Sequence, residues 1–228
     1  MVNNDNYQLN LTTSRRLTAS VYELDFEKPE GFQYLAGQFV EFFIPVNSEM
    51  LRRSYSISSA PSSGKLQFCI KSRKDGIGSE YLTSLKVGDG VTVSVAKGKF
   101  VCAGEGGKNI FIATGVGIAP VISMLEESAI QNKEHENKLL FGVREESELF
   151  WMERLQTLKA NDQRFDYQIT LSRPGDGWKG QKGRVSEQLI IEKDAEYYLC
   201  GSKEMVIEVR GKLIDAGLNT KCIHFEIF

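Results

Sequence analysis

A chain of 228 residues with 41% hydrophobic residues is long enough for one large domain or two ordinary ones with a sizeable core. The formal net charge of −2 gives no basic excess for nucleic acid, and no apolar run approaches the roughly 20 residues of a membrane helix. The N-terminus has no secretory pattern, so we expect a cytoplasmic protein without nucleic-acid or membrane partners.

The first hundred residues predict β-structure, because short segments rich in aromatic and β-branched residues alternate with turn sequences. One helix is expected at 78–85. Several short strands with a single helix indicate a small antiparallel barrel. Strands are predicted at 20–26, 38–44, 52–58, 65–71 and 90–96.

After the glycine cluster at 104–107, strands alternate with helices, which is typical of a doubly wound parallel sheet. Such sheets bind ligands at the carboxyl ends of their strands, near the switch point. We therefore expect a β-barrel domain over residues 1–103 and an α/β domain over residues 104–228. Strands are predicted at 109–113, 138–143, 166–171, 196–200 and 221–227, and helices at 118–131, 148–158, 186–191 and 203–216.

The four cysteines are widely spaced in the sequence. No Cys-x-x-Cys pair supports a zinc ribbon, and the spacing of a plant-type iron–sulfur cluster is missing, so no metal site is expected. Buried thiols are predicted for Cys69, Cys102 and Cys222. Cys200 ends a predicted strand and is a candidate for contact with a ligand.

The segment RRSYSISS at 52–59 combines residue types that suit a flat, phosphorylated ligand. An arginine neutralises phosphate, an aromatic ring stacks on a planar heterocycle, and a hydroxyl donates to or accepts from a ring nitrogen. An ordinary surface strand, with Tyr55 as a core aromatic of the barrel, is the alternative.

The segment ATGVGIAP at 113–120 joins the first strand of the second half to its helix. Thr114, Gly115 and Gly117 allow a tight turn, and Pro120 suits the first turn of a helix whose N-terminus attracts anions. A plain strand-to-helix turn has the same composition. The position at the start of a βαβ array favours a nucleotide loop.

A second candidate phosphate loop is KDGIGSEYL at 74–82. Gly76 and Gly78 precede Ser79, which is predicted to cap the helix and to share its N-terminus with a phosphate. A simple capped helix is an equally good interpretation of these residues.

Together, and in order over nearly the whole chain, these segments resemble the ferredoxin–NADP reductase superfamily. RRSYSISS is similar to the flavin motif R-x-Y-S-x-x-S, FCIK at 68–71 to the strand beside the flavin, and GIGSEYL to the flavin-phosphate loop. ATGVGIAP resembles the dinucleotide loop G-T-G-x-x-P, with Val116 at a usually small polar position. YLCGSKEM at 198–205 resembles C-G-x-x-x-M, and the terminal HFEIF resembles the plant-type ending H-V-E-T-Y.

The resemblance implies an FAD-dependent oxidoreductase that moves electrons between NADPH, or NADH, and a ferredoxin, flavodoxin or other protein acceptor, by hydride transfer to flavin N5. It implies Ser56, Cys200, Glu226 and Phe228 around the catalytic contact. A reductase of free flavin or small acceptors, and a flavin electron-transfer subunit that does not turn over pyridine nucleotide alone, are the alternatives. The implied cofactor-binding residues are Arg53, Tyr55, Ser56, Ser59, Cys69, Ile70, Lys71, Gly76, Gly78, Ser79, Thr114, Gly115, Gly117, Pro120, Arg144, Ser172, Arg173, Arg184, Cys200, Gly201, Met205 and Phe228.

Three arginines follow predicted strands of the second half, namely Arg144, Arg173 and Arg184. Arginine suits bidentate phosphate contacts, although each of the three alone also fits a solvated surface. Their placement resembles the cations around the 2′-phosphate in NADPH-using relatives. NADPH is therefore expected, although Pro174 interrupts the S-R-E sequence of that site.

Overall fold

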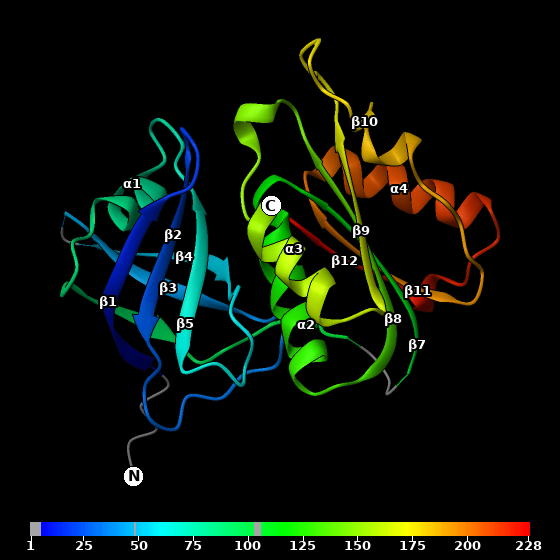
Figure 1. Ribbon diagram of the computed structural model, residues 1–228. Helices are drawn as coiled ribbons and strands as arrows, with labels where there is room; N and C mark the ends of the chain where they lie inside the picture. Colours follow the sequence, from blue (N-terminus) through cyan, green and yellow to red (C-terminus); the bar gives the residue numbers. More distant parts are fainter. Residues whose placement is uncertain (1–5, 48, 103–105) are drawn as a thin grey trace.

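The computed structural model describes residues 6–47, 49–102 and 106–228, which form two β-sheets of different kinds (Figure 1). The last strand of the first sheet ends at Ser94, and the first strand of the second sheet begins at Gly106. The predicted boundary between residues 103 and 104 lies outside the described residues and stays a prediction.

The first sheet has the strand order β4-β3-β6-β1-β2-β5 and curls until its two edges meet. A bridge between Ile57 and Phe68 and a 2.8 Å hydrogen bond from the Ser58 N–H to the Gln67 carbonyl join the two edges. This closure confirms the predicted antiparallel barrel, formed as a curled sheet. The strands are β1 (Asn6–Arg16), β2 (Val21–Glu27), β3 (Phe39–Val46), β4 (Glu49–Ser56), β5 (Lys65–Lys71) and β6 (Gly90–Ser94).

β1 is missing from the predicted strands, yet it pairs with both β2 and β6 in the middle of the sheet. Its apolar residues Tyr7, Leu9 and Leu11 alternate with polar ones and contact the barrel core. Asn6 and Asn10 on its outer face belong to a residue type that is depleted in strands, so the segment looks like a polar terminus in the sequence.

Aromatic residues fill the barrel and make it a rigid platform for the residues at its rim. The rings of Phe26, Phe42 and Phe68 pack on one another with centroid distances of 4.9 to 6.0 Å. Helix α1 (Ile77–Ser84) packs against this core through Leu82, which is fully buried.

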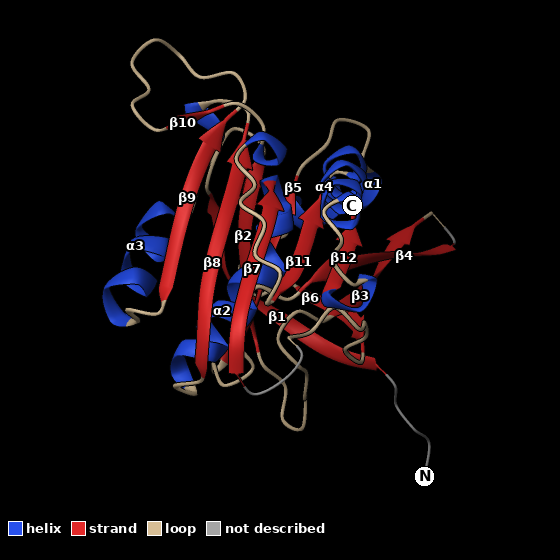
Figure 2. Cartoon of the chain, turned by 90° about the vertical axis from the view of Figure 1, so that its right-hand side faces the viewer, coloured by secondary structure: helices blue, strands red, loops and turns tan. Residues whose placement is uncertain are grey.

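The second sheet is parallel, with the strand order β10-β9-β8-β7-β11-β12 (Figure 2). Helices α2 and α3 cover the face toward the barrel, and α4 covers the opposite face (Figure 1). This arrangement confirms the doubly wound α/β half. Its elements are β7 (Gly106–Thr114), α2 (Ile118–Ile130), β8 (Glu134–Val143), α3 (Met152–Asn161), β9 (Phe165–Leu171), β10 (Gln181–Lys182), β11 (Ala195–Gly201), α4 (Lys203–Asp215) and β12 (Ile223–Ile227).

Two predicted helices are shorter in the structure than the sequence suggests. The predicted helix at 148–158 begins only at Met152, because Trp151 has left-handed backbone angles, with φ 58°, which end any helix that precedes it. In place of the predicted helix at 186–191, only a short 3₁₀ turn forms at Val185–Glu187. The apolar residues Leu189 and Ile191 pack on the α4 side of the core outside any helix.

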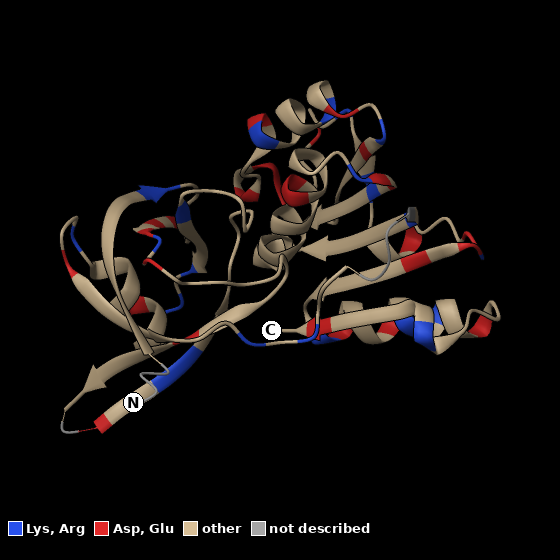
Figure 3. Cartoon of the chain, turned by 90° about the horizontal axis from the view of Figure 1, so that it is seen from below, with Lys and Arg blue, Asp and Glu red and all other residues tan. Residues whose placement is uncertain are grey.

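Among the helices of the described ranges, none combines the length and the apolar character that a membrane crossing requires. Seen from below, acidic and basic segments are interspersed over both halves of the molecule (Figure 3). The same view shows the C-terminus between the two halves, where the site described next is found.

Candidate functional site

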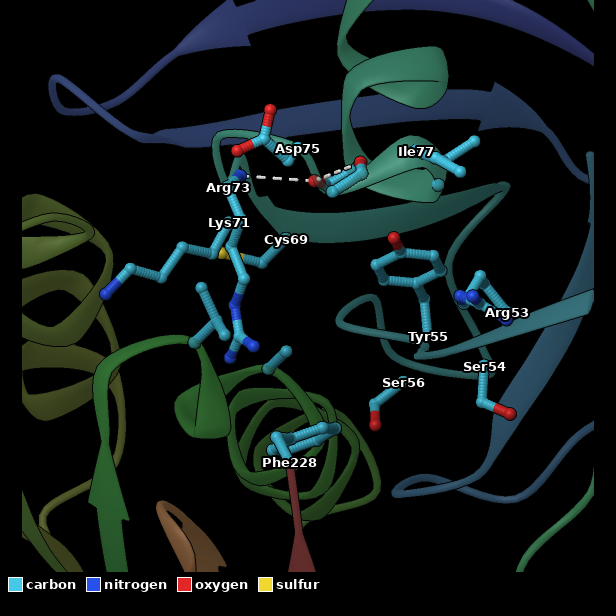
Figure 4. Close-up of a pocket in the computed structure, with 15 residues that line it drawn as sticks. Arg53, Ser54, Tyr55, Ser56, Cys69, Lys71, Arg73, Asp75, Ile77 and Phe228 are labelled. Atoms are coloured by element: carbon cyan, nitrogen blue, oxygen red, sulfur yellow. Dashed lines mark hydrogen bonds between the residues drawn. The ribbon is translucent and has the colours of Figure 1, made fainter.

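A cavity of about 450 Å³ opens where the barrel meets the second domain (Figure 4). The barrel contributes the ends of β4 and β5 and the loop into α1, and the second domain contributes the start of α2 and the chain end. The volume lies within the roughly 300–1,000 Å³ of small-molecule sites. The lining residues are Arg53, Ser54, Tyr55, Ser56, Cys69, Lys71, Arg73, Asp75, Gly76, Ile77, Gly78, Ser79, Val116, Ala119 and Phe228.

The end of β4 brings three predicted residues to this cavity. Arg53 is exposed, Tyr55 is half-buried and Ser56 is buried. The Tyr55 ring packs edge-on against Phe42 at a centroid distance of 5.6 Å, which leaves it fixed at the cavity wall. Burial raises the pKa of Tyr55, so its phenol is neutral and its ring offers a flat apolar surface.

The loop into α1 approaches β4 closely because Gly78 has no side chain. A Cβ at Gly78 would lie 2.8 Å from Cγ of Arg53 and 3.3 Å from Cδ1 of Ile44. The glycine therefore lets the first turn of α1 and the Arg53 side chain share one edge of the cavity. Backbone N–H groups at a helix start together with a guanidinium suit an anion such as a phosphate.

The predicted capping role of Ser79 is wrong. Helix α1 begins at Ile77, before Ser79, and has no side-chain cap. The Ser79 hydroxyl instead accepts a hydrogen bond from the Arg73 N–H at 3.1 Å and donates one to the Gly76 carbonyl at 2.9 Å. Ser79 thus closes the loop from the inside, and no side chain competes for the first N–H groups of the helix.

Cations dominate the charged lining of the cavity, with Arg53, Lys71 and Arg73 against Asp75. Figure 4 shows the Arg73 side chain extended into the cavity toward the second domain. Arg73 was not among the predicted residues, although it directly precedes the second phosphate loop in the sequence. The positive excess suits a ligand that carries phosphates.

Ser56 and Glu226 join the two halves of the molecule at the cavity. The Ser56 hydroxyl donates to Oε2 of Glu226 at 3.4 Å, across the gap between β4 and β12. Burial raises the pKa of Glu226, and the hydrogen bond from Ser56 opposes this effect. Cys200 lies opposite Glu226 in the pairing of β11 with β12. These three of the four predicted catalytic residues therefore form one connected group.

Replacing Glu226 by glutamine is expected to stabilise the protein at about pH 8 and to have no such effect near pH 4. When folding raises the pKa of a carboxyl group, the protein loses stability as the pH rises from the unfolded pKa to the folded pKa. Above both values the carboxyl group is ionised in both states, and its ionised form destabilises the folded protein. The neutral amide avoids this cost. Thermal unfolding midpoints at several pH values measure the effect, at roughly 2–4 °C per kcal/mol.

Glu204 provides the control for this pH experiment. It lies in the first turn of α4, where its pKa is lowered by a backbone hydrogen bond and by Ser202. Glu204→Gln should therefore not raise the unfolding midpoint at about pH 8. An identical gain in both variants would show that burial of Glu226 is not the cause.

Phe228, the last residue, lines the cavity and is held by its backbone. Its N–H donates to the Gly201 carbonyl at 3.1 Å, directly after the paired residues of β11 and β12. Its side chain is 45% exposed and faces the cavity from the second domain, whereas Tyr55 faces it from the barrel (Figure 4). The backbone of the last residue is therefore held beside the end of β11.

The predicted nucleotide loop lies at the switch point of the parallel sheet, between the neighbouring strands β7 and β11. A Cβ on Gly117 would lie 2.3 Å from the Cys200 carbonyl oxygen, and one on Gly201 would lie 2.1 Å from Oγ1 of Thr114. The Ser202 N–H donates to the same Thr114 hydroxyl at 3.2 Å. Glycines at both positions thus let the two loops pack backbone to backbone.

The other predicted residues of this region occupy the same end of the sheet. Gly115 has φ +55° in the turn before α2, and Pro120 is in the first turn of that helix. Met205 is buried in the first turn of α4, which Ser202 caps at its start. Cys200 is fully buried, and burial raises the pKa of its thiol well above the usual value, so it is a neutral group.

The loops after β8 and β9 bring two of the predicted arginines together. The Arg173 N–H donates to the Arg144 carbonyl at 2.8 Å, and the Ser172 N–H donates to the Val143 carbonyl at 3.1 Å. Arg144 and Arg173 are exposed at the carboxyl end of the sheet. Arg184 is also exposed and lies 3.9 Å from a carboxylate oxygen of Glu208 on α4.

Of the site residues predicted in the barrel, two do not reach the cavity with their side chains. Ser59 is buried, where its hydroxyl accepts from the Gln67 N–H at 3.1 Å and bonds with the Tyr34 hydroxyl at 3.0 Å. Ile70 points into the barrel core, as strand alternation requires between Cys69 and Lys71. Their side chains support the barrel beneath the site.

The cysteines are free thiols in different environments. Cys69 is buried as predicted, but it also lines the cavity. Cys102 and Cys222 are only partly buried, which corrects the prediction of buried thiols for both. Cys102 packs on the edge of a core cluster of the second domain, and Cys222 ends the short 3₁₀ turn before β12.

Models of two known domain families match the two halves of the chain. The oxidoreductase FAD-binding domain matches residues 8–102, and the oxidoreductase NAD-binding domain matches residues 111–211. A curled barrel joined to a parallel nucleotide-binding sheet, with these two matches, defines a flavin-dependent oxidoreductase that also binds a pyridine nucleotide.

Known proteins with a similar sequence and fold agree with this class. "Ferredoxin--NADP reductase B" of Sorangium cellulosum is 31% identical over 99% of each chain. The "Toluate 1,2-dioxygenase electron transfer component" of Pseudomonas putida is 30% identical over 97% of this chain, which spans 67% of that relative. A solved ferredoxin NADP⁺ reductase of Neisseria gonorrhoeae has the same fold, with a TM-score of 0.86, 22% identity and 98% of each chain covered. The chain belongs to the ferredoxin–NADP reductase superfamily.

Proposed function

We propose that this chain takes electrons from NADPH, with NADH as a poorer donor, and passes them through FAD to a protein acceptor such as a ferredoxin or a flavodoxin. The observation that carries the proposal is the contact to Glu226 from Ser56, which lines a cavity that the flavin-motif strand and the nucleotide loop share. The full-length similarity to a protein named as a ferredoxin–NADP reductase supports the choice of acceptor.

The residues around the cavity fit an FAD group. In the proposal, the Tyr55 and Phe228 rings flank the flavin ring, while Arg53, Arg73 and the start of α1 bind the phosphates. Gly78 permits the close approach of α1 to Arg53 that brings these phosphate-binding groups together. When bound, FAD supplies the acceptance of a hydride from the nicotinamide and the onward release of electrons.

The protein's own groups orient the reactants and control the charge around them. The Ser56 hydroxyl is assigned to a flavin ring nitrogen, because a hydroxyl donates or accepts as the protonation of that nitrogen changes. Glu226 holds the Ser56 hydroxyl in place. The neutral Cys200 thiol is buried at the switch point, so in the proposal it packs behind the nicotinamide site, and Phe228 excludes water from the ring face.

The acceptor is tested by reducing the protein anaerobically with NADPH and then adding acceptors one at a time. We expect rapid reoxidation by a ferredoxin or flavodoxin, slower reoxidation by free flavin, and a protein that stays yellow through purification. A protein that loses its flavin on purification and reduces only free flavin would instead be a flavin reductase. A protein that NADPH and NADH both fail to reduce would be an electron-transfer subunit.

Arg173→Ala is expected to lower kcat/KM for NADPH about tenfold and to leave the value for NADH nearly unchanged, since a hydrogen bond to a charged group contributes about 1.5–3 kcal/mol. Arg173 and Arg144 meet at the carboxyl end of the sheet, where a 2′-phosphate needs cations. Steady-state kinetics with both coenzymes measure the change. Arg210→Ala, on the middle of α4, is the control. An unaltered preference for NADPH in Arg173→Ala would contradict the assignment.

A further inference from the structure

A second polar region lies at the other end of the interface between the barrel and the second domain. β5 runs from one region to the other, with Cys69 and Lys71 at the cavity and Lys65 and Gln67 in this second region. Helix α2 does the same, with Ala119 at the cavity and Glu126 at the far end. The interface is therefore held at two ends, and only one of them is the candidate active site.

Arg154 of α3 is the centre of this second region. Its guanidinium binds both carboxylate oxygens of Glu126, with Nε to Oε1 at 2.5 Å and Nη2 to Oε2 at 2.7 Å. From there it reaches into the barrel, donating to Oε1 of Gln67 at 2.6 Å and to the Ser58 carbonyl at 2.9 Å. The planar guanidinium of Arg154 thus connects α2, α3 and the barrel through its N–H donors.

Trp151 strengthens the same connection from the start of α3. Its indole N–H donates to Oε2 of Glu23 at 2.7 Å, and Glu23 is a buried carboxylate of β2. The Arg154 guanidinium lies over the Trp151 ring at 4.6 Å. Trp151 has φ 58°, a strained angle for a bulky residue, which persists only where surrounding contacts fix it. The strained backbone of Trp151 therefore lies where the second domain contacts the barrel.

The contacts of Arg154 lead directly to the candidate active site. Ser58, whose carbonyl Arg154 binds, follows Ser56 by two residues. The next carbonyl, that of Ser59, accepts a 2.5 Å hydrogen bond from the Ser123 hydroxyl of α2. The second domain therefore holds the backbone that carries Ser56, and it also supplies Glu226, the partner of the Ser56 hydroxyl.

We infer that Arg154 is a positioning residue, which fixes the barrel against the second domain so that Ser56 meets Glu226 and the two cofactor sites face each other. The inference rests on the proposed function, because the facing sites matter for transfer between coenzyme and flavin. Misplacement of reactants by about 1 Å slows a reaction up to 100-fold. Arg154 touches neither cofactor site, so its removal should slow the transfer and leave both binding steps intact.

The test uses Arg154→Met, which keeps most of the apolar stem of the side chain and removes its guanidinium donors. In the full-length protein, we expect normal FAD content, an unchanged dissociation constant for NADPH and flavin reduction slowed about tenfold in anaerobic rapid mixing. Hydrogen exchange of the segment 57–63 should become faster. Combining Arg154→Met with Ser56→Ala should slow reduction by less than the product of the two single effects, because both variants act on the position of the Ser56 hydroxyl.

Lys159→Met on the same helix is the matched control, since Lys159 pairs with Asp166 inside the second domain. Arg154→Lys keeps the positive charge without the planar guanidinium, so it should show an intermediate slowing of flavin reduction. It replaces Arg154→Met in the test if the methionine variant does not fold. Wild-type exchange of 57–63 in Arg154→Met or Arg154→Lys would overturn the inference whatever the activity. Fully additive effects of Arg154→Met and Ser56→Ala on the free energy of activation for flavin reduction would also overturn the inference. Failure of the wild-type protein to accept electrons from either coenzyme would instead refute the proposed function.

Discussion

Alanine in place of Ser56 is expected to slow the reduction of the bound flavin by NADPH about 100-fold, as the loss of one preorganised hydrogen-bond donor does in other active sites. Ser56 is buried at the end of β4, and its hydroxyl points to Glu226 at 3.4 Å. The hydroxyl therefore has a fixed direction before any ligand binds. Its loss removes the donor without opening the barrel, because alanine fits wherever serine does.

The measurement for Ser56→Ala is the rate of flavin bleaching in anaerobic rapid mixing, together with FAD content and the NADPH dissociation constant. Both binding properties should stay close to wild type, since Arg53, Arg73 and the loop into α1 are unchanged. Ser84→Ala is a control in the same domain, because the exposed Ser84 hydroxyl only donates to the Tyr81 carbonyl. Equal rates in wild type and Ser56→Ala would remove Ser56 from the site.

Phe228→Ser is expected to bind nicotinamide coenzyme up to about tenfold more tightly and to discriminate less between NADPH and NADH. The Phe228 ring lines the cavity opposite Tyr55 (Figure 4), and in the proposed function it occupies the flavin face that the nicotinamide must reach. An aromatic stacking contact contributes about 0.5–1.5 kcal/mol, and this stabilisation is lost when the coenzyme displaces the ring. Serine makes no such contact, so the coenzyme has no competitor.

Coenzyme titrations and the visible flavin spectrum measure the effect of Phe228→Ser. The spectrum should change as well, because the ring beside the flavin is lost. Phe225→Ser is a matched control: Phe225 is 47% exposed against 45% for Phe228, but it lies beside Arg210 of α4. Wild-type dissociation constants and a wild-type spectrum in Phe228→Ser would mean that the ring is not on the flavin.

The sequence was sufficient to predict the parts of the site that depend on local chain geometry. Strand alternation and turn composition predict both sheets, and Gly78, Gly117 and Gly201 stand where neighbouring segments approach too closely for a side chain. The placement of the nucleotide loop at the switch point follows from the βαβ order alone. Each of these features is encoded in a short stretch of residues.

Features that depend on contacts between distant segments were not predictable. The hydroxyl of Ser79 bonds within its own loop rather than capping α1, because Arg73 presents its N–H to it. The late start of α3 reflects the left-handed conformation of Trp151, which the contact with Glu23 on β2 supports. Arg154 looks like an ordinary helix cation in the sequence, and only the folded interface gives it Ser58 and Gln67 as partners.

The proposed function requires that the cavity bring a flavin and a nicotinamide together for direct hydride transfer. The most direct test is anaerobic rapid mixing of the FAD-loaded protein with NADPH that carries deuterium at the transferred position of C4. We expect the flavin absorbance to bleach without any added protein and deuterium to slow this bleaching. No bleaching, or bleaching that occurs only when a second protein is present, would contradict it.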